Sequence, residues 1–130
     1  MALMTWSTDY SVEVALLDKQ HQKLFEMLNK LHNAMRLGEG RHLAPRILSE
    51  LVQYTREHFA TEEALMKQAN YPELIAHKAE HDKLTREVVK MVQDIEQGKA
   101  VLSMKLMQFL ESWLKDHILG RDKKYVSYMK

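Results

Sequence analysis

The sequence predicts an all-α protein: an up-down-up-down antiparallel four-helix bundle with an extended N-terminal arm and a short C-terminal helix. Strong helix formers dominate the composition, which contains only four glycines and two prolines. Apolar residues recur at three- and four-residue steps in four long segments, and the connections between these segments are short. The 130 residues suit a single domain, divided into an arm (1–17), a bundle (18–119) and a C-terminal segment (120–130).

The arm and the first two helices have clear boundaries in the sequence. The arm mixes aromatic and β-branched residues without helical periodicity, and the first helix opens near Asp18. Gly38 and the glycine two positions later are suited to end this helix. The second helix is expected over about 41–68, with Pro45 in its first turn, where a missing N–H costs least. The inward face expected for the first helix comprises His21, Leu24, Phe25, Leu28, His32 and Met35.

The last two helices follow a turn at 70–72. The third helix is expected to continue to about Gln97. The fourth begins near Ser103, a suitable N-cap, and Gly120 interrupts it. A short helical stretch around 125–128 is expected to end the chain.

Composition and charge exclude several classes of function. The net charge is +1 with basic and acidic residues interspersed, so neither nucleic acid nor an anionic membrane is an expected partner. The absence of cysteine excludes disulfides, zinc–thiolate sites, iron–sulfur clusters and thiol catalysis. We find no secretion signal and no apolar run of the ~20 residues that span a bilayer. The expectation is a monomeric cytoplasmic protein without stable membrane insertion.

Imidazoles and a carboxylate occupy positions on the apolar helix faces, where such groups are rare unless they are paired or bind a metal. Two pairs have i,i+4 spacing, which places both side chains on one helix face. In an antiparallel bundle the start of one helix neighbours the end of the next, so the whole set should converge at one end. The set comprises His21, His58, Glu62, His77, His81 and His117.

Asp122 is a further candidate ligand with a less favourable spacing. It follows His117 by five residues, a rotation of about 500° that leaves about 140° between the two side chains on an ideal helix. We expect Gly120 to let the backbone leave α-helical geometry and turn Asp122 inward.

The size of this ligand set indicates two metal ions rather than one. A single tetrahedral zinc takes four ligands, fewer than the set offers. If both carboxylates bridge two octahedral ions, the imidazoles, the carboxylates and a bridging oxo or hydroxo group fill every position but one. A vacant position on a reduced metal binds a small molecule. Imidazole together with bridging carboxylate favours iron.

Other residues near these motifs have simpler interpretations. A lone helical histidine is most often a core or surface residue, which is the interpretation for His32 and His42. Glu63 lacks the i+4 relation to His58 and is expected to be solvated. A group of apolar residues belongs to the core and should also wall the vacant metal position: Phe25, Phe59, Trp113, Leu114 and Ile118.

These motifs resemble the hemerythrin family over essentially the whole chain. The matching segments are 18–21, 58–62, 77–81 and 117–122, preceded by an arm with Trp6 and Tyr10 that is similar to that of bacterial members. The resemblance implies reversible dioxygen binding at two irons bridged by Glu62 and Asp122. It places His77, His81 and His117 on one iron, and His21 and His58 on the open iron.

Three classes of function fit such a site. The leading hypothesis is a protein that carries or stores dioxygen or delivers it to an oxygen-consuming enzyme. A sensor is the second, although a chain ending at Lys130 has no room for an output domain. The third is catalysis, but di-iron oxygenases use Glu-x-x-His pairs and carboxylate-rich ligands, whereas this histidine-rich set favours reversible binding. We therefore do not expect an enzyme.

Overall fold

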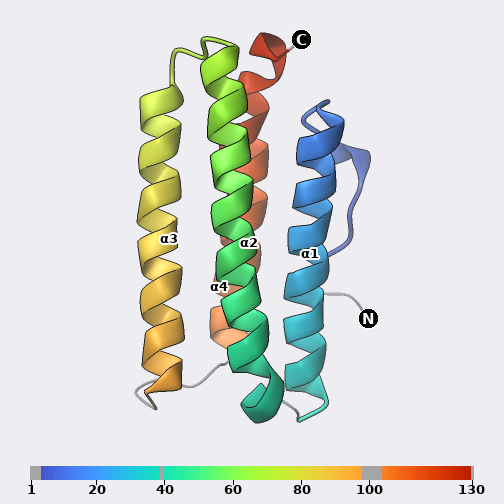
Figure 1. Cartoon of the computed structure of the whole chain (residues 1–130). Helices are drawn as coiled ribbons and strands as arrows, with labels where there is room; N and C mark the ends of the chain where they lie inside the picture. Colours follow the sequence, from blue (N-terminus) through green and yellow to red (C-terminus); the bar gives the residue numbers. More distant parts are fainter. Residues whose placement is uncertain (1–3, 39, 98–103, 130) are drawn as a thin grey trace.

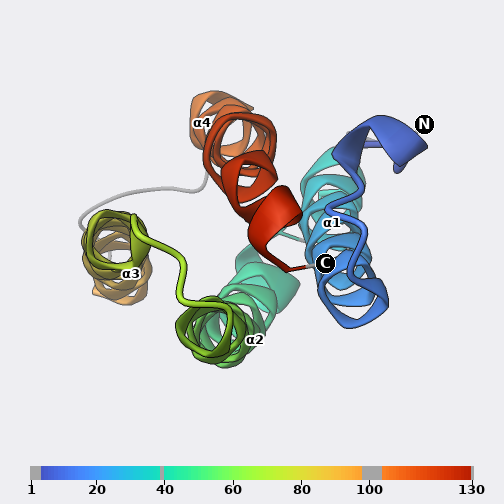
Figure 2. The same ribbon diagram turned by 90° about the horizontal axis from the view of Figure 1, so that it is seen from above.

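The computed structural model describes residues 4–38, 40–97 and 104–129, with the side chains of 40–44 and 104–106 outside the described part. Four helices pack antiparallel, and Figures 1 and 2 show them side by side around a common axis. The predicted all-α bundle is thereby confirmed. Among the described helices, none is long and apolar enough to cross a membrane. The helices are α1 (Ala15–Arg36), α2 (Gly40–Gln68), α3 (Leu74–Glu96) and α4 (Met104–Asp116).

The chain does not stop being helical after α4. A π-helical turn, η2 (His117–Arg121), follows without a break and leads into a 3₁₀ helix, η3 (Asp122–Tyr128). The expected short C-terminal helix is therefore present. The proposed cap Ser103 lies outside the described residues.

The first helix begins at Ala15, three residues before the expected start at Asp18. Asp18 lies in the first turn and binds the arm from inside the helix. Its carboxylate accepts the backbone N–H of Val12 at 2.8 Å and the hydroxyl of Ser11 at 2.6 Å. A negative charge in the first turn also suits the helix dipole. At the other end the chain leaves the helix through Gly38, whose φ of +74° favours glycine.

The arm lies along α1 (Figure 1). It contains a short 3₁₀ turn, η1 (Thr8–Tyr10). The rings of Trp6 and Tyr10 pack edge-on against Phe25, with centroids 5.5 and 4.9 Å away. Further along α1, the Asn29 amide accepts from the backbone N–H of Met4 and donates to its carbonyl, both at 2.8 Å. These contacts hold the arm against the bundle.

The apolar core forms two clusters. The larger fills the bundle, and the smaller lies at the end where the C-terminus returns; it comprises Val12, Leu17, Met66, Tyr71 and Tyr125. On α1 the expected inward face needs one correction: His32 and Met35 are half-buried, whereas Leu31 and Ala34 are buried in the core. The buried face thus follows a seven-residue repeat, which keeps a helix facing its neighbours in a gently supercoiled bundle.

Candidate metal centre

The seven predicted ligands converge between the two core clusters, in the half of the bundle where the chain passes from α2 to α3. Figure 1 shows the C-terminus at this same end of the bundle. Helical spacing explains the position of the ligands. Leu17, Met66 and Tyr125 belong to the small cluster, and each lies one helical turn from a ligand. Other residues close to the ligands along the helices belong to the large cluster. All seven side chains are buried: His21, His58, Glu62, His77, His81, His117 and Asp122.

These side chains form two overlapping groups, each with its donor atoms within 4.8 Å of one another. The first group combines three imidazoles with two carboxylates, and the second combines two imidazoles with the same two carboxylates. The shared residues are Glu62 and Asp122. A centre for two cations joined by two carboxylates has this arrangement of donors.

The Glu62 carboxylate presents one oxygen to each group. Its Oε1 lies 2.9 Å from Nε2 of His77 and 3.0 Å from Nε2 of His81. Its Oε2 lies 3.3 Å from Nε2 of His58 and 3.6 Å from Nε2 of His21. The carboxylate therefore stands between the two groups with a lone pair available to each.

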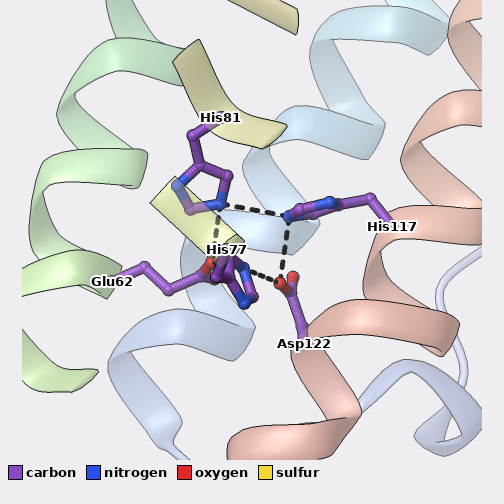
Figure 3. A group of neighbouring side chains, drawn as sticks. All are labelled: Glu62, His77, His81, His117 and Asp122. Atoms are coloured by element: carbon purple, nitrogen blue, oxygen red, sulfur yellow. Dashed lines mark hydrogen bonds and ion pairs between the residues drawn. The ribbon is translucent and has the colours of Figure 1, made fainter. Parts of the chain in front are cut away.

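Asp122 repeats this arrangement from the opposite side (Figure 3). Its Oδ1 lies 2.9 Å from Nε2 of His77 and 3.1 Å from Nε2 of His117. Its Oδ2 faces Nε2 of His21 at 3.1 Å. Both carboxylates consequently span the same pair of positions.

The inward direction of Asp122 comes from the π-helical turn. In a π-helix each N–H bonds five residues back, and here the N–H of Asp122 donates to the carbonyl oxygens of His117 and Ile118. The wider turn brings residues five apart onto one face. The expected departure from α-helical geometry around Gly120 is confirmed, but it does not depend on a glycine, because the φ of Gly120 is not positive and a Cβ there would meet nothing within 4 Å. The redirection requires the wider turn and not a glycine.

Two imidazoles are oriented by polar side chains from neighbouring helices. Nδ1 of His58 lies 2.7 Å from Oε1 of Gln20, and Nδ1 of His81 lies 2.9 Å from Oε2 of Glu63. A proton held at Nδ1 leaves the Nε2 lone pair free for a metal. The expectation that Glu63 is solvated was wrong, because it is partly buried and bonded to His81. The only signal for these partners in the sequence is that they are adjacent to His21 and Glu62.

A third polar contact reaches the centre from η3. The buried Tyr125 hydroxyl donates to Oε2 of Glu62 at 2.9 Å, and its ring lies over that of His77 with the planes inclined by 30° and the centroids 5.8 Å apart. From the sequence, Tyr125 was expected only to lie in the terminal helical stretch. Its three-residue spacing from Asp122 was the signal that it could share the same helix face.

Burial and charge act in opposite directions on the titration of the centre in the absence of a bound cation. Burial lowers the pKa of His21 and His77, but the carboxylates of Asp122 and Glu62 outweigh it and raise both to about 9. Burial prevails at His58, whose pKa is lowered. Burial raises the carboxylate pKa values, yet the imidazoles hold Glu62 well below its usual range and Asp122 at about 2. The centre therefore keeps both carboxylates ionised.

The unsatisfied atoms fit a bound cation. Neither ring nitrogen of His21 and neither oxygen of Asp122 makes a geometrically sound hydrogen bond within the part of the chain that the structure describes. Nε2 of His81 also lies 3.1 Å from Nε2 of His117. Buried polar atoms are rarely left in this state unless a metal or water satisfies them. The donor set suits an ion that accepts both imidazole and carboxylate.

A narrow apolar cavity of about 40 Å³ borders the centre on the side of the large core cluster. Of the five predicted wall residues, Phe59, Trp113 and Leu114 line it. Phe25 and Ile118 are buried in the same cluster but do not line this cavity. Phe59 stacks on the ring of His81, with centroids 3.7 Å apart. The cavity has room for a small molecule and, being mostly apolar, favours one that is itself apolar.

The two histidines predicted not to bind metal have different outcomes. His32 is half-buried and belongs to neither donor group of the described residues. The side chain of His42 lies outside the described part.

Comparisons with known proteins agree with this geometry. Residues 12–129 match the family model described as the Hemerythrin HHE cation binding domain. The chain is 36% identical over 130 residues to a bacteriohemerythrin of Stenotrophomonas maltophilia, covering all of this chain and 84% of that one. It is 36% identical to a bacteriohemerythrin of Methylococcus capsulatus, covering 96% and 95%. A crystal structure of wild-type hemerythrin superposes with a TM-score of 0.93 at 35% identity, covering 98% of each chain.

Proposed function

The chain belongs to the hemerythrin family, and we propose that its buried centre holds two iron ions and binds dioxygen reversibly. The observation that carries this proposal is the placement of the carboxylate oxygens. Glu62 and Asp122 each direct one oxygen to the three-imidazole group and the other to the two-imidazole group. Two separate single-metal sites would have no need of shared carboxylates.

The ligand roles follow from the two groups. His77, His81 and His117, with the shared carboxylates, would hold one iron. His21 and His58 would hold the other with fewer protein donors, which would leave room for a small molecule. The chemistry that a reduced iron pair would supply here is reversible two-electron donation to dioxygen.

The chain's own residues make reversal possible by keeping water and protons away. Phe59, Trp113 and Leu114 line an apolar cavity that admits dioxygen more readily than water. Gln20 and Glu63 keep His58 and His81 in orientation, so that the ligands need not rearrange between states. A rigid and dry site favours release over irreversible oxidation.

Transport or storage fits this site better than catalysis. The described centre is richer in imidazole than in carboxylate, and imidazole-rich iron sites lack the anionic donors that stabilise high oxidation states. Delivery of oxygen to an oxygen-consuming enzyme, a cytoplasmic location and a monomeric state remain predictions from the sequence.

Anaerobic iron loading tests the proposal. Purified protein loaded with ferrous iron is expected to bind two irons per chain and to show a charge-transfer absorption band when air is admitted. The band should disappear under argon and reappear in air over repeated cycles. One iron per chain, or a band that forms once and does not reverse, would contradict reversible binding at a two-iron centre.

Leu114→Ala should accelerate autoxidation of the oxygenated protein. Leu114 is 5% exposed and lines the cavity beside the centre, so its truncation enlarges the cavity and lets water in. We expect the rate to rise on the order of tenfold, equivalent to lowering the barrier by about 1.4 kcal/mol. The decay of the charge-transfer band in air measures this rate.

Leu31→Ala is the matched control for Leu114→Ala. Leu31 is fully buried in the same core cluster but lies ten residues, or about 15 Å, along α1 from His21. It should lose comparable stability without faster autoxidation. An equal acceleration in both variants would assign the effect to general destabilisation.

A further inference from the structure

Three tyrosines form a continuous line from the metal centre to the surface. Tyr125 is fully buried, and its hydroxyl donates to Oε2 of Glu62 at 2.9 Å. Its ring meets that of Tyr71 edge-on with centroids 6.2 Å apart, and Tyr71 meets Tyr128 in the same manner at 5.1 Å. Tyr71 is 5% exposed and Tyr128 is 46% exposed. Both contacts have the separation typical of packed aromatic pairs.

Each buried tyrosine of this line also has a carboxylate beside its hydroxyl. Glu62 accepts from Tyr125, and Oε2 of Glu73 accepts from Tyr71 at 3.2 Å. Each hydroxyl therefore donates its proton to a carboxylate. A neutral phenol can lose an electron easily only if its proton leaves at the same time. The carboxylates supply that proton acceptor.

We propose that Tyr125, Tyr71 and Tyr128 form a relay that carries oxidising equivalents from the metal centre to the protein surface. This inference rests on the iron centre proposed above and assigns to the protein a second, protective function. An iron centre that meets hydrogen peroxide instead of dioxygen can be oxidised beyond its working states. Through the relay, Tyr128 is oxidised at the surface in place of the side chains that bind the metal.

Electrons and protons balance at each step. Tyr125 would give one electron to the oxidised centre while its phenolic proton moves along the hydrogen bond to Oε2 of Glu62, onto the lone pair that this oxygen does not direct at an iron, and Tyr125 would become a neutral phenoxyl radical. Tyr71 then reduces that radical and passes its own proton to Glu73, while Tyr125 regains its proton from Glu62. Tyr128 reduces Tyr71 in turn, losing its proton to water as Glu73 returns the proton to Tyr71. A thiol in solution reduces Tyr128, so that two passes convert one hydrogen peroxide and two thiols into two waters and a disulfide.

Trp113 offers the competing route. Its ring stacks on His117 with centroids 4.8 Å apart, and it is half-buried on the opposite side of the centre. Among the described residues its ring pairs with Phe59 and His117 and not with a tyrosine ring. Phe59 stacks on His81 but has no proton to release and is much harder to oxidise. The two routes therefore predict different end points, Tyr128 or Trp113.

Spin trapping on the iron-loaded protein distinguishes these end points. Wild-type protein, with two irons per chain and a reversible oxygenated band established beforehand, is treated with hydrogen peroxide and a nitroso spin trap. Mass spectrometry then locates the adduct, and electron paramagnetic resonance of frozen samples detects the radical. We expect the adduct on Tyr128, its loss when a soluble thiol is added, and no adduct when the iron is omitted.

Tyr71→Phe is the decisive variant, because it keeps the ring, removes the proton donor and touches no metal ligand. The Tyr128 adduct should be lost, with oxidation retained at Tyr125 or moved to Trp113. Tyr54→Phe is the matched control: Tyr54 packs on the large core cluster outside the line, and its loss should leave the adduct unchanged. Tyr128→Phe, at an exposed site, should move the adduct inward to Tyr71.

The outcomes separate this inference from the proposed function. A Tyr128 adduct that persists in Tyr71→Phe, or a wild-type adduct on Trp113 alone, overturns the relay while leaving oxygen binding intact. The same adduct in iron-free protein also overturns the relay, because oxidation would then start in solution. Failure to bind two irons overturns both proposals at once.

Discussion

Glu62→Ala is expected to abolish oxygen binding while preserving most of the helix content. The substitution removes the carboxylate whose two oxygens face imidazoles of both groups, and it deprives the Tyr125 hydroxyl of its acceptor. Neither iron position keeps its full set of donors, so we expect no oxygenated band and fewer than two irons per chain. The helices should persist because their apolar faces are unchanged. Iron content, absorption in air and circular dichroism measure these three properties.

Glu57→Ala is the matched control on the same helix. Glu57 is exposed and accepts a hydrogen bond from Gln53 at 3.2 Å, outside both donor groups. It should bind two irons and oxygenate normally. His58→Ala provides a second test, because it removes one imidazole from the two-imidazole group alone. We expect it to lose oxygen binding as well; a full oxygenated spectrum in either site variant would show that the ligand assignment is wrong.

The fold and the convergence of the ligands could be predicted because they depend on local rules. Helical periodicity places His58 with Glu62, and His77 with His81, on single faces. Short connections then require antiparallel neighbours, which bring the ends of α2 and α4 to the starts of α1 and α3. Polar groups at inward positions of such helices have few explanations other than a shared site.

The features that sequence analysis missed depend on contacts between elements. The departure from α-helical geometry before Asp122 was expected, but its form as a π-helical turn was not, and this turn does not require the glycine to which the departure was attributed. Glu63 orients His81, and Gln20 orients His58, only because the packing of the helices places each polar side chain beside the imidazole of a neighbouring helix. Tyr125 likewise depends on how the terminal 3₁₀ helix folds back over the centre.

Removing the iron is expected to destabilise the fold by an amount that grows as the pH rises from about 6.5 to about 9. Without the metal, the carboxylates raise the pKa of His21 and His77 to about 9, against 6.5 in the unfolded chain. Their protonation therefore stabilises the iron-free fold fully below pH 6.5, and this contribution is lost as the pH rises through 9. The pKa of Asp122 is about 2 and that of His58 is lowered, so neither group adds a slope in this window.

The iron-loaded protein lacks this loss, because its imidazoles bind the metal deprotonated at every pH in the window. Each of the two histidines can contribute up to about 1.4 kcal/mol per pH unit to the difference between the forms. Thermal unfolding of both forms at intervals from pH 6.5 to 9 should therefore show a gap in Tm that widens steadily. His32→Asn, outside both donor groups, should leave the gap unchanged. If the Tm values of the two forms instead changed in parallel with pH, the cation would not displace protons from His21 and His77, and these imidazoles would not be its ligands.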